Sequence, residues 1–424
     1  MEIISFEDNG KLIRLADSIE ACGANQWLSA SGTIPKSQFT PEQCLNNLKK
    51  NYKSILVDFP SLRLKLIKKE NLYYWAYTTN EEIKFENVIN IVDLTLIDDV
   101  PESFPLDIGP LWRVHFSQIG DKIKIKVIAS HSLVYGRSIF LLLDLFSSYA
   151  LNKEFPEKLK MLKNQPILYR FGKSDWFTIE VTDKKDYEPF VEFKIKTIDL
   201  FPSFELPSHL VNIQWDVPYL PISKFCRKHD ISPQAFLMAI QNTAIRIYHK
   251  GKLDDTPIGV HIPVDNKYTK YASELFKKSL FFLHAGFVVT FMENEKDMLE
   301  NMKKCYKSLK ESLNTSISCD ITYFLSNFFD ENGKFIPPKT FFDGESISFA
   351  SHIGLVGEGF EDVQFRFYQP IENNKYKALF YGFHNQETFS FMLLAPFNYS
   401  DDYLKILKEV SLKYYDFMAK DVSE

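Results

Sequence analysis

The sequence predicts a mixed α/β protein built from two lobes, and three observations support this fold class. The chain has 424 residues, 45% of them hydrophobic, which is more than one core normally holds. Strand-like and helix-like segments alternate along it, and its two halves carry the same kinds of segment. We expect an N-terminal lobe over 1–165, a linker or crossover over 166–207 and a C-terminal lobe over 208–424, with a cleft or tunnel for a ligand between the lobes.

Two helices begin with clear capping signals. Thr40 is suited to the N-cap, with a proline after it and Gln43 in the capping-box position. In the second half, Ser232 precedes Pro233 in the same arrangement. Each signal opens a run of apolar residues at helical spacing, which predicts one helix packed on each lobe.

A predicted hairpin places a histidine next to a buried strand end. Two β-rich runs flank Gly120-Asp121, and lysines alternate with Ile and Val over 122–127. We therefore expect these lysines to face water and the apolar residues to face the core. The same alternation places His131 on the inner face, just before Gly136 and a largely apolar helix.

Composition excludes several classes of function. The formal net charge of −5 gives no basic excess for nucleic acid. Five scattered cysteines without a CxxC favour a reducing compartment, and the lone pair Cys226 and His229 is not a zinc site. No signal peptide and no run of about twenty apolar residues occurs, so we expect a soluble, cytoplasmic protein without a metal. P-loop, GxGxxG and GxSxG patterns are also missing.

The segment Ser130-His131-Ser-Leu-Val-Tyr135-Gly136 resembles HHxxxDG, the signature of the coenzyme-A-dependent acyltransferase superfamily, which includes chloramphenicol acetyltransferase and condensation domains. Five further segments resemble landmarks of that superfamily in the same order: residues 60–66, 104–116, 232–245, 261–268 and 348–357. The alcohol acetyltransferase-like branch is the most similar, since the chain carries PLWRV and SHIG and lacks DFGWG.

The resemblance implies two chloramphenicol-acetyltransferase-like lobes with the active site in the tunnel between them. His131 would be the general base in the transfer of an acyl group, such as acetyl, from coenzyme A to a small alcohol or amine. Acyl-CoA would be a co-substrate, with no tightly bound cofactor. Ser351 or His352, in the segment that resembles SNxG, would stabilise the oxyanion.

Two positions of the motif depart from the family pattern. Ser130 replaces the first histidine, and Tyr135 replaces an aspartate that in the family pairs with an arginine and holds the loop. The loop must therefore be held differently here, while Gly136 would allow a tight junction between loop and helix.

Two alternatives stay open. A degraded enzyme of the same fold would bind a ligand or a protein without turnover, and Tyr135 and His352 favour that reading. A condensation-type enzyme would take its acyl group from a carrier protein; the lack of a fused carrier or adenylation module disfavours it.

Overall fold

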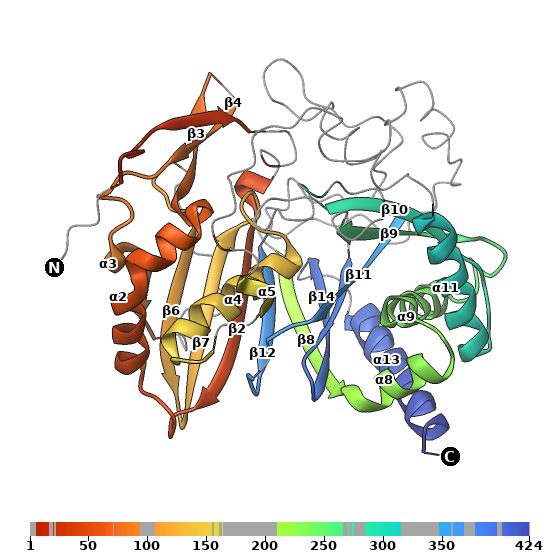
Figure 1. Cartoon of the computed structure of the whole chain (residues 1–424). Coiled ribbons are helices and arrows are strands. Elements are labelled where there is room, and N and C mark those ends of the chain that lie inside the picture. The colour runs from red at the N-terminus through yellow and green to blue at the C-terminus, as the bar shows by residue number, and fades with distance from the viewer. Residues whose placement is uncertain are drawn as a thin grey trace.

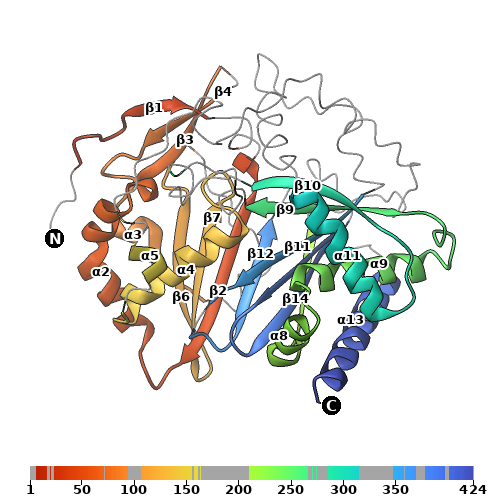
Figure 2. The ribbon, with the colours of Figure 1, turned by 45° about the vertical axis from the view of Figure 1, so that its right-hand side comes forward.

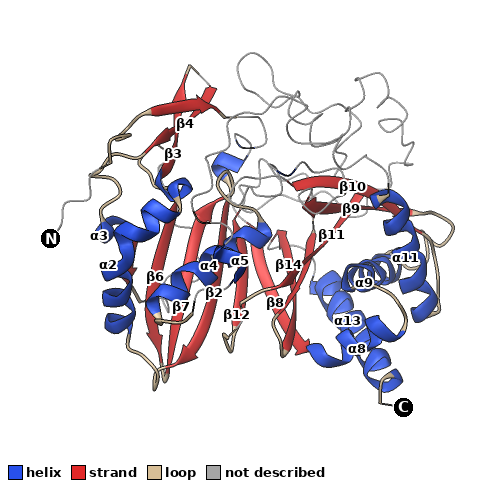
Figure 3. Ribbon diagram, viewed as in Figure 1, coloured by secondary structure: helices blue, strands red, loops and turns tan. Residues whose placement is uncertain are grey.

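Two lobes stand side by side in the computed structural model, and each contains a mixed sheet with helices on it (Figures 1 and 3). The structure describes residues 6–16, 20, 23–70, 72–93, 107–154, 157–160, 163, 210–265, 270, 274, 285–314, 347–357, 359–368, 378–396 and 401–423. The expected linker over 166–207 lies outside these residues. The predicted two-lobed, mixed α/β fold is confirmed.

The N-terminal lobe contains a five-stranded sheet in the order β12-β2-β7-β6-β5. Its strands are β2 (Trp27–Pro35), β5 (Ile89–Ile91), β6 (Trp112–Ile119), β7 (Lys122–Ser130) and β12 (Val363–Tyr368). A smaller sheet has the order β1-β4-β3, from β1 (Leu12–Leu15), β3 (Leu64–Lys69) and β4 (Leu72–Tyr77).

Helices α2 (Pro41–Asp58) and α4 (Gly136–Ala150) cover one face of the larger sheet. The predicted capping box of α2 is present: the Gln43 amide N–H donates to the Thr40 hydroxyl, and the Gln43 side chain accepts from the Thr40 N–H. The short helices of this lobe are η1 (Gly23–Asn25), η2 (Pro60–Arg63), α3 (Phe85–Val88) and α5 (Glu157–Lys160).

The hairpin at Gly120-Asp121 forms as expected, but the expectation that its lysines face water is wrong for Lys124 and Lys126. Lys124 and Lys126 are each only 3% exposed. They alternate with apolar neighbours as predicted, yet the face they occupy is polar rather than open, with Ser31 opposite Lys126 and Thr33 opposite Lys124 on β2. The Lys124 ammonium donates to the side chain of Gln364 at 3.0 Å, so hydrogen bonding replaces hydration here.

The C-terminal lobe contains a six-stranded sheet in the order β10-β9-β11-β13-β14-β8. Its strands are β8 (Leu210–Pro218), β9 (Ile258–Asp265), β10 (Ala285–Met292), β11 (Ile347–Leu355), β13 (Leu379–His384) and β14 (Thr388–Pro396). Its helices are α8 (Tyr219–Lys228), α9 (Pro233–Tyr248), α11 (Met298–Leu313) and α13 (Asp401–Asp421). The Ser232 hydroxyl caps α9 as predicted, accepting from the Ala235 N–H. None of the helices described here is long and apolar enough to cross a bilayer.

One strand of the second half belongs to the sheet of the first. β12 lies antiparallel to β2, with Phe367 opposite Leu28, and Figure 2 shows the blue β12 beside the red β2. β12 lies within 208–424, the span expected for the C-terminal lobe. A division of the chain at residue 208 therefore does not account for this exchange of a strand. The exchange carries residues of that half to the end of β7, where the candidate base lies.

Candidate functional site

His131 occupies the turn between β7 and α4, one residue past the end of the strand. Its ring Nδ1 lies 2.7 Å from the carbonyl oxygen of Val134. A carbonyl only accepts, so this bond fixes the proton of a neutral imidazole on Nδ1 and leaves the lone pair on Nε2. Among the described residues no hydrogen bond involves Nε2, and the residue as a whole is only partly buried. The ring therefore has the tautomer of a base.

Residues that precede β2 fix the backbone of this turn by hydrogen bonds. The His131 N–H donates to the Gln26 carbonyl at 2.7 Å, and the Ser132 hydroxyl donates to the Glu20 carbonyl at 2.6 Å. The Glu20 carboxylate forms a bidentate ion pair with the guanidinium of Arg14, and both N–O distances are 2.7 Å. These bonds fix the backbone from which the imidazole projects.

Gly23 lies so close to the turn that only glycine fits there. A Cβ on Gly23 would lie 2.7 Å from both the His131 carbonyl carbon and the Ser132 nitrogen. Gly136, by contrast, has no left-handed φ, and a Cβ there would meet nothing nearer than 3.6 Å, at Ile353. The close approach thus occurs at Gly23, a position that the motif does not include.

Burial lowers the pKa of His131 below its usual value of 6.5, and the backbone hydrogen bonds around it oppose this only in part. The imidazole is therefore neutral at pH 7. A neutral ring with a fixed tautomer can accept a proton on Nε2, as a general base must.

Tyr135 links this turn to the other lobe. It is the N-cap of α4, and its hydroxyl donates to a carboxylate oxygen of Asp265 at 2.6 Å. Asp265 ends β9 in the C-terminal lobe. Tyr135 replaces the aspartate of the motif, so another interaction must fix the loop. The hydrogen bond from Tyr135 to Asp265, which joins the two lobes, is such an interaction.

The two oxyanion candidates lie on opposite faces of β11. Side chains alternate along a strand, and Ser351 shares its face with Phe349, which packs in the core cluster that contains the N-terminal lobe. His352 shares the other face with Ala350, which packs in the core of the C-terminal lobe. The Ser351 face is therefore the one turned toward the N-terminal lobe, up to the bulge that interrupts the strand between His352 and Gly354.

His352 belongs to an aromatic stack on the helix-covered face. Its ring is parallel to those of His384 and Phe389, at centroid distances of 5.4 and 5.7 Å. Its Nε2 is buried and has no hydrogen-bond partner in the part of the chain that the structure describes. Burial, with the nearby charges of His384 and Arg137, lowers the pKa of His352 to about 3. Ser130 is also buried, and its hydroxyl accepts from the Ser132 N–H at 3.3 Å, which supports the turn rather than the reaction.

Phe367 is a residue of the site that sequence reasoning missed. Its ring meets that of His131 edge to face, at a centroid distance of 5.3 Å and an interplanar angle of 84°. It arrives on β12, so only the pairing of β12 with β2 brings it near His131. Nothing in the sequence near residue 367 signals that pairing.

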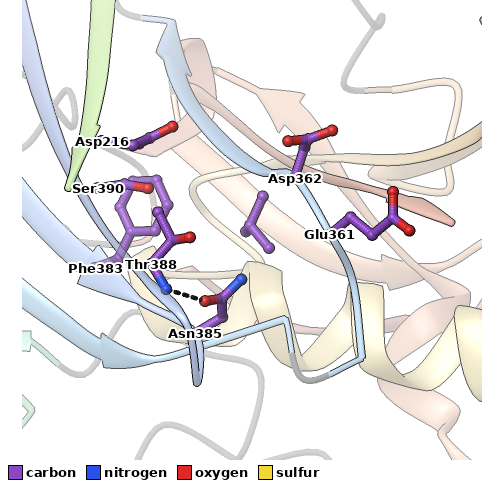
Figure 4. Close-up of a pocket in the computed structure, with 8 residues that line it drawn as sticks. Asp216, Glu361, Asp362, Phe383, Asn385, Thr388 and Ser390 are labelled. Carbon is purple, nitrogen blue, oxygen red and sulfur yellow. Dashed lines mark hydrogen bonds between the residues drawn. The ribbon is translucent and has the colours of Figure 1, made fainter. Parts of the chain in front are cut away.

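A small polar pocket of 30 Å³ lies elsewhere, among Asp216, Glu361, Asp362, Asn385 and their neighbours (Figure 4). Lys122, at the start of β7, donates to Asp362 at 2.9 Å. His131 follows the other end of that strand, roughly 30 Å away. In the part of the chain that the structure describes, no group of three His, Cys, Asp or Glu side chains is arranged for a metal ion. The pocket is therefore separate from the histidine site.

Comparison with known proteins shows which solved structures share the fold of this chain. No protein-family model and no curated protein matches it. Trichothecene 15-O-acetyltransferase from Fusarium sporotrichioides is similar in structure, with a TM-score of 0.69 and 10% identity over 98% of this chain and 97% of that one. Polyketide synthase associated protein 5 from Mycobacterium tuberculosis gives 0.63 and 12%, over 96% and 99%.

The epimerization domain from the third module of tyrocidine synthetase B gives a TM-score of 0.64 and 14% identity, over 98% of each chain. At such identities the likeness shows a shared fold. The chain has the two-lobed architecture of the chloramphenicol-acetyltransferase-like and condensation-domain structures, as its sequence predicted.

Proposed function

We propose that this protein is an acyltransferase that moves an acyl group from coenzyme A to the hydroxyl or amine of a small acceptor, with His131 as general base. The observation that carries the proposal is the bond from His131 Nδ1 to the Val134 carbonyl. It leaves Nε2 as the proton acceptor in a turn that adjoins the other lobe. The shared fold with an acetyltransferase supports the same reaction.

The reaction follows from that tautomer. As the acceptor oxygen or nitrogen attacks the thioester carbonyl carbon, its proton passes to Nε2, and a tetrahedral intermediate with one oxyanion forms. The intermediate collapses with cleavage of the C–S bond, and the proton on Nε2 passes to the leaving thiolate. Ester or amide and free coenzyme A are the products. A positioned base contributes about 10²- to 10⁴-fold to such a rate.

Ser351 is our candidate for the oxyanion donor. Its face of β11 is turned toward the N-terminal lobe, and a hydroxyl can donate to a developing negative charge. His352 is the other candidate from the sequence. Its place in the stack with His384 and Phe389 favours a structural role.

A carrier-protein thioester is the second candidate for the acyl donor. The fold is shared with an epimerization domain of a peptide synthetase and with the condensation domain of the monacolin K polyketide synthase. The base and the bond changes are the same for either donor, because both are thioesters. The alcohol acetyltransferase-like branch, an acetyl donor and a cytoplasmic location remain parts of the proposal.

The test is thiol release from a panel of acyl-CoAs, in the presence of mixed alcohols and amines, by the wild type and by His131→Ala. We expect acceptor-dependent release that the substitution abolishes while the protein stays folded. Release from acyl-pantetheine on a carrier protein, without release from any acyl-CoA, would transfer the proposal to the second donor. A folded wild type that binds acyl-CoA yet releases no thiol from either donor would contradict catalysis and favour a binding protein.

A further inference from the structure

Two β-strands from different sheets meet along one seam, which we define as the contact between β8 and β12. β8 is the edge of the C-terminal sheet, and β12 is the edge of the N-terminal sheet. No ladder joins them. Side chains of β8 instead bind the backbone of β12 at two places, through Asn212 and Gln214.

At one end of the seam, Asn212 holds Phe367 on both sides of its backbone. The Phe367 N–H donates to the Asn212 Oδ1 at 3.0 Å, and the Asn212 Nδ2 donates to the Phe367 carbonyl at 3.2 Å. Arg366 adds a bond to the Asn212 carbonyl at 3.2 Å. A side chain that satisfies the N–H and the C=O of one residue fixes that residue's place closely.

Phe367 in turn restrains the imidazole. Phe367 is 6% exposed, and its ring meets His131 edge to face, a favourable arrangement for aromatic pairs. The Nδ1 bond to Val134 fixes one edge of the imidazole. A second contact on the ring restricts its rotation about χ2, the motion that would turn Nε2 away from a substrate.

We propose that Asn212 is a positioning residue for His131, acting through Phe367, so that the first strand of the C-terminal lobe orients the base in the N-terminal lobe. This inference rests on the proposed function for its kinetic consequence, but not for its structural one. A base misplaced by a fraction of an ångström loses much of its advantage, since proton transfer needs a close and aligned donor.

The other end of the seam supplies a matched control. Gln214 donates from Nε2 to the Val363 carbonyl at 2.9 Å. It lies on the same strand, two residues from Asn212, and binds the same partner strand four residues from Phe367. Gln214→Ala therefore weakens the seam without touching the segment against His131.

The experiment compares Asn212→Ala, Gln214→Ala and Phe367→Leu in the full chain. Proton resonances of the His131 ring are followed by NMR on histidine-labelled protein and assigned by their loss in His131→Ala. Phe367→Leu removes the ring current on His131 and defines the shifts without it. We expect Asn212→Ala to move the His131 signals toward those shifts, and Gln214→Ala to leave them at the wild-type values.

Turnover gives the second readout. We expect kcat to fall about tenfold in Asn212→Ala with KM nearly unchanged, and to stay at the wild-type value in Gln214→Ala. Unchanged His131 signals in Asn212→Ala, or equal changes in both seam variants, would overturn the proposal. If the wild type turns over no thioester, the proposed function fails, and the ring signals still decide whether Asn212 positions His131. Phe367→Leu keeps the seam bonds, so it tests the aromatic contact even if Asn212→Ala does not fold.

Discussion

His131 and His352 are both enclosed histidines with a lowered pKa, yet their surroundings differ in kind. His131 lies in a turn, with one ring nitrogen bonded to a backbone carbonyl and the other without a hydrogen bond among the described residues. His352 lies on a strand beside two parallel rings, and its buried Nε2 has no hydrogen-bond partner among the described residues. A lowered pKa is common to both and so cannot identify the base.

What separates them is the fixed tautomer. A base needs a defined lone pair that a substrate can reach, and the Val134 carbonyl provides that definition for His131 alone. The His352 stack defines the plane of a ring without defining its proton. Hydrogen-bond geometry is therefore a better guide to catalysis here than the degree of burial.

The largest expected effect tests this contrast directly. His131→Ala should lower kcat/KM for thioester transfer by about 10²- to 10⁴-fold, because the acceptor proton loses its base. His352→Gln should lower it by less than about tenfold, since the ring lies on the face of β11 that packs on the C-terminal core. Steady-state thiol release on both variants measures the two losses. Equal losses would show that the two histidines act together, contrary to our assignment.

A second comparison uses the two glycines beside His131. Gly23→Ala forces a Cβ to 2.7 Å from the turn backbone, so the turn or the segment must shift. We expect a stability loss of about 1–3 kcal/mol and, from the displaced base, a loss of about 10²-fold in kcat/KM. Urea unfolding and thiol release measure these two quantities.

Gly136→Ala is the control, because its Cβ would make only ordinary contacts. Stability should be unchanged or higher by about 0.5–1 kcal/mol, as for a glycine replaced at a compatible backbone position, and activity should be kept. A severe loss from Gly136→Ala with a mild one from Gly23→Ala would reverse our view of which glycine the site needs.

The fold was largely predictable because its signals are local. The cap at Thr40, the cap at Ser232 and the turn at Gly120-Asp121 each depend on a few adjacent residues, and the structure contains all three. The solvent exposure of Lys124 and Lys126 was predicted wrongly. Alternation states which residues share a face, whereas the surroundings of that face depend on distant parts of the chain.

The candidate site was predictable only in part, for the same reason. The motif identified His131 and Tyr135, but the partner of Tyr135 lies 130 residues away on β9. Phe367 and Asn212 reach the site only through the placement of β12 on β2. The geometry that separates Ser351 from His352 depends on which face of β11 meets the N-terminal lobe. None of these distances in space can be read from spacing in the sequence.

A smaller effect concerns the bond between the lobes. Tyr135→Phe removes only the hydroxyl that donates to Asp265, so we expect a stability loss of about 1 kcal/mol and a fall in kcat of about tenfold as the turn loosens. Tyr52→Phe is the control: the Tyr52 hydroxyl donates to the Ile83 carbonyl at 2.8 Å in the N-terminal core. It should lose similar stability and no activity. Loss of activity in the control alone would show that core packing, not the contact between lobes, limits turnover.

The smallest effect is in pH dependence, and it separates the two histidines again. Burial lowers the pKa of His131, so the acid limb of kcat/KM should have its midpoint below pH 6.5. His352→Gln should leave that midpoint unchanged. The dependence of stability on pH, in contrast, should change in His352→Gln. Since the pKa of His352 is 6.5 when unfolded and about 3 when folded, the unfolded chain binds the extra proton below pH 6.5.

Stability should therefore fall as the pH drops from about 6.5 toward 3, by at most about 1.4 kcal/mol per pH unit for this group. Replacing His352 with glutamine removes this pH-dependent contribution to the free energy of unfolding. The variant should therefore lose less stability than the wild type between pH 7.5 and pH 5. Urea unfolding at the two pH values measures the difference. An acid limb that moves in His352→Gln, with a stability profile like that of the wild type, would place the titrating base in the stack and not in the turn.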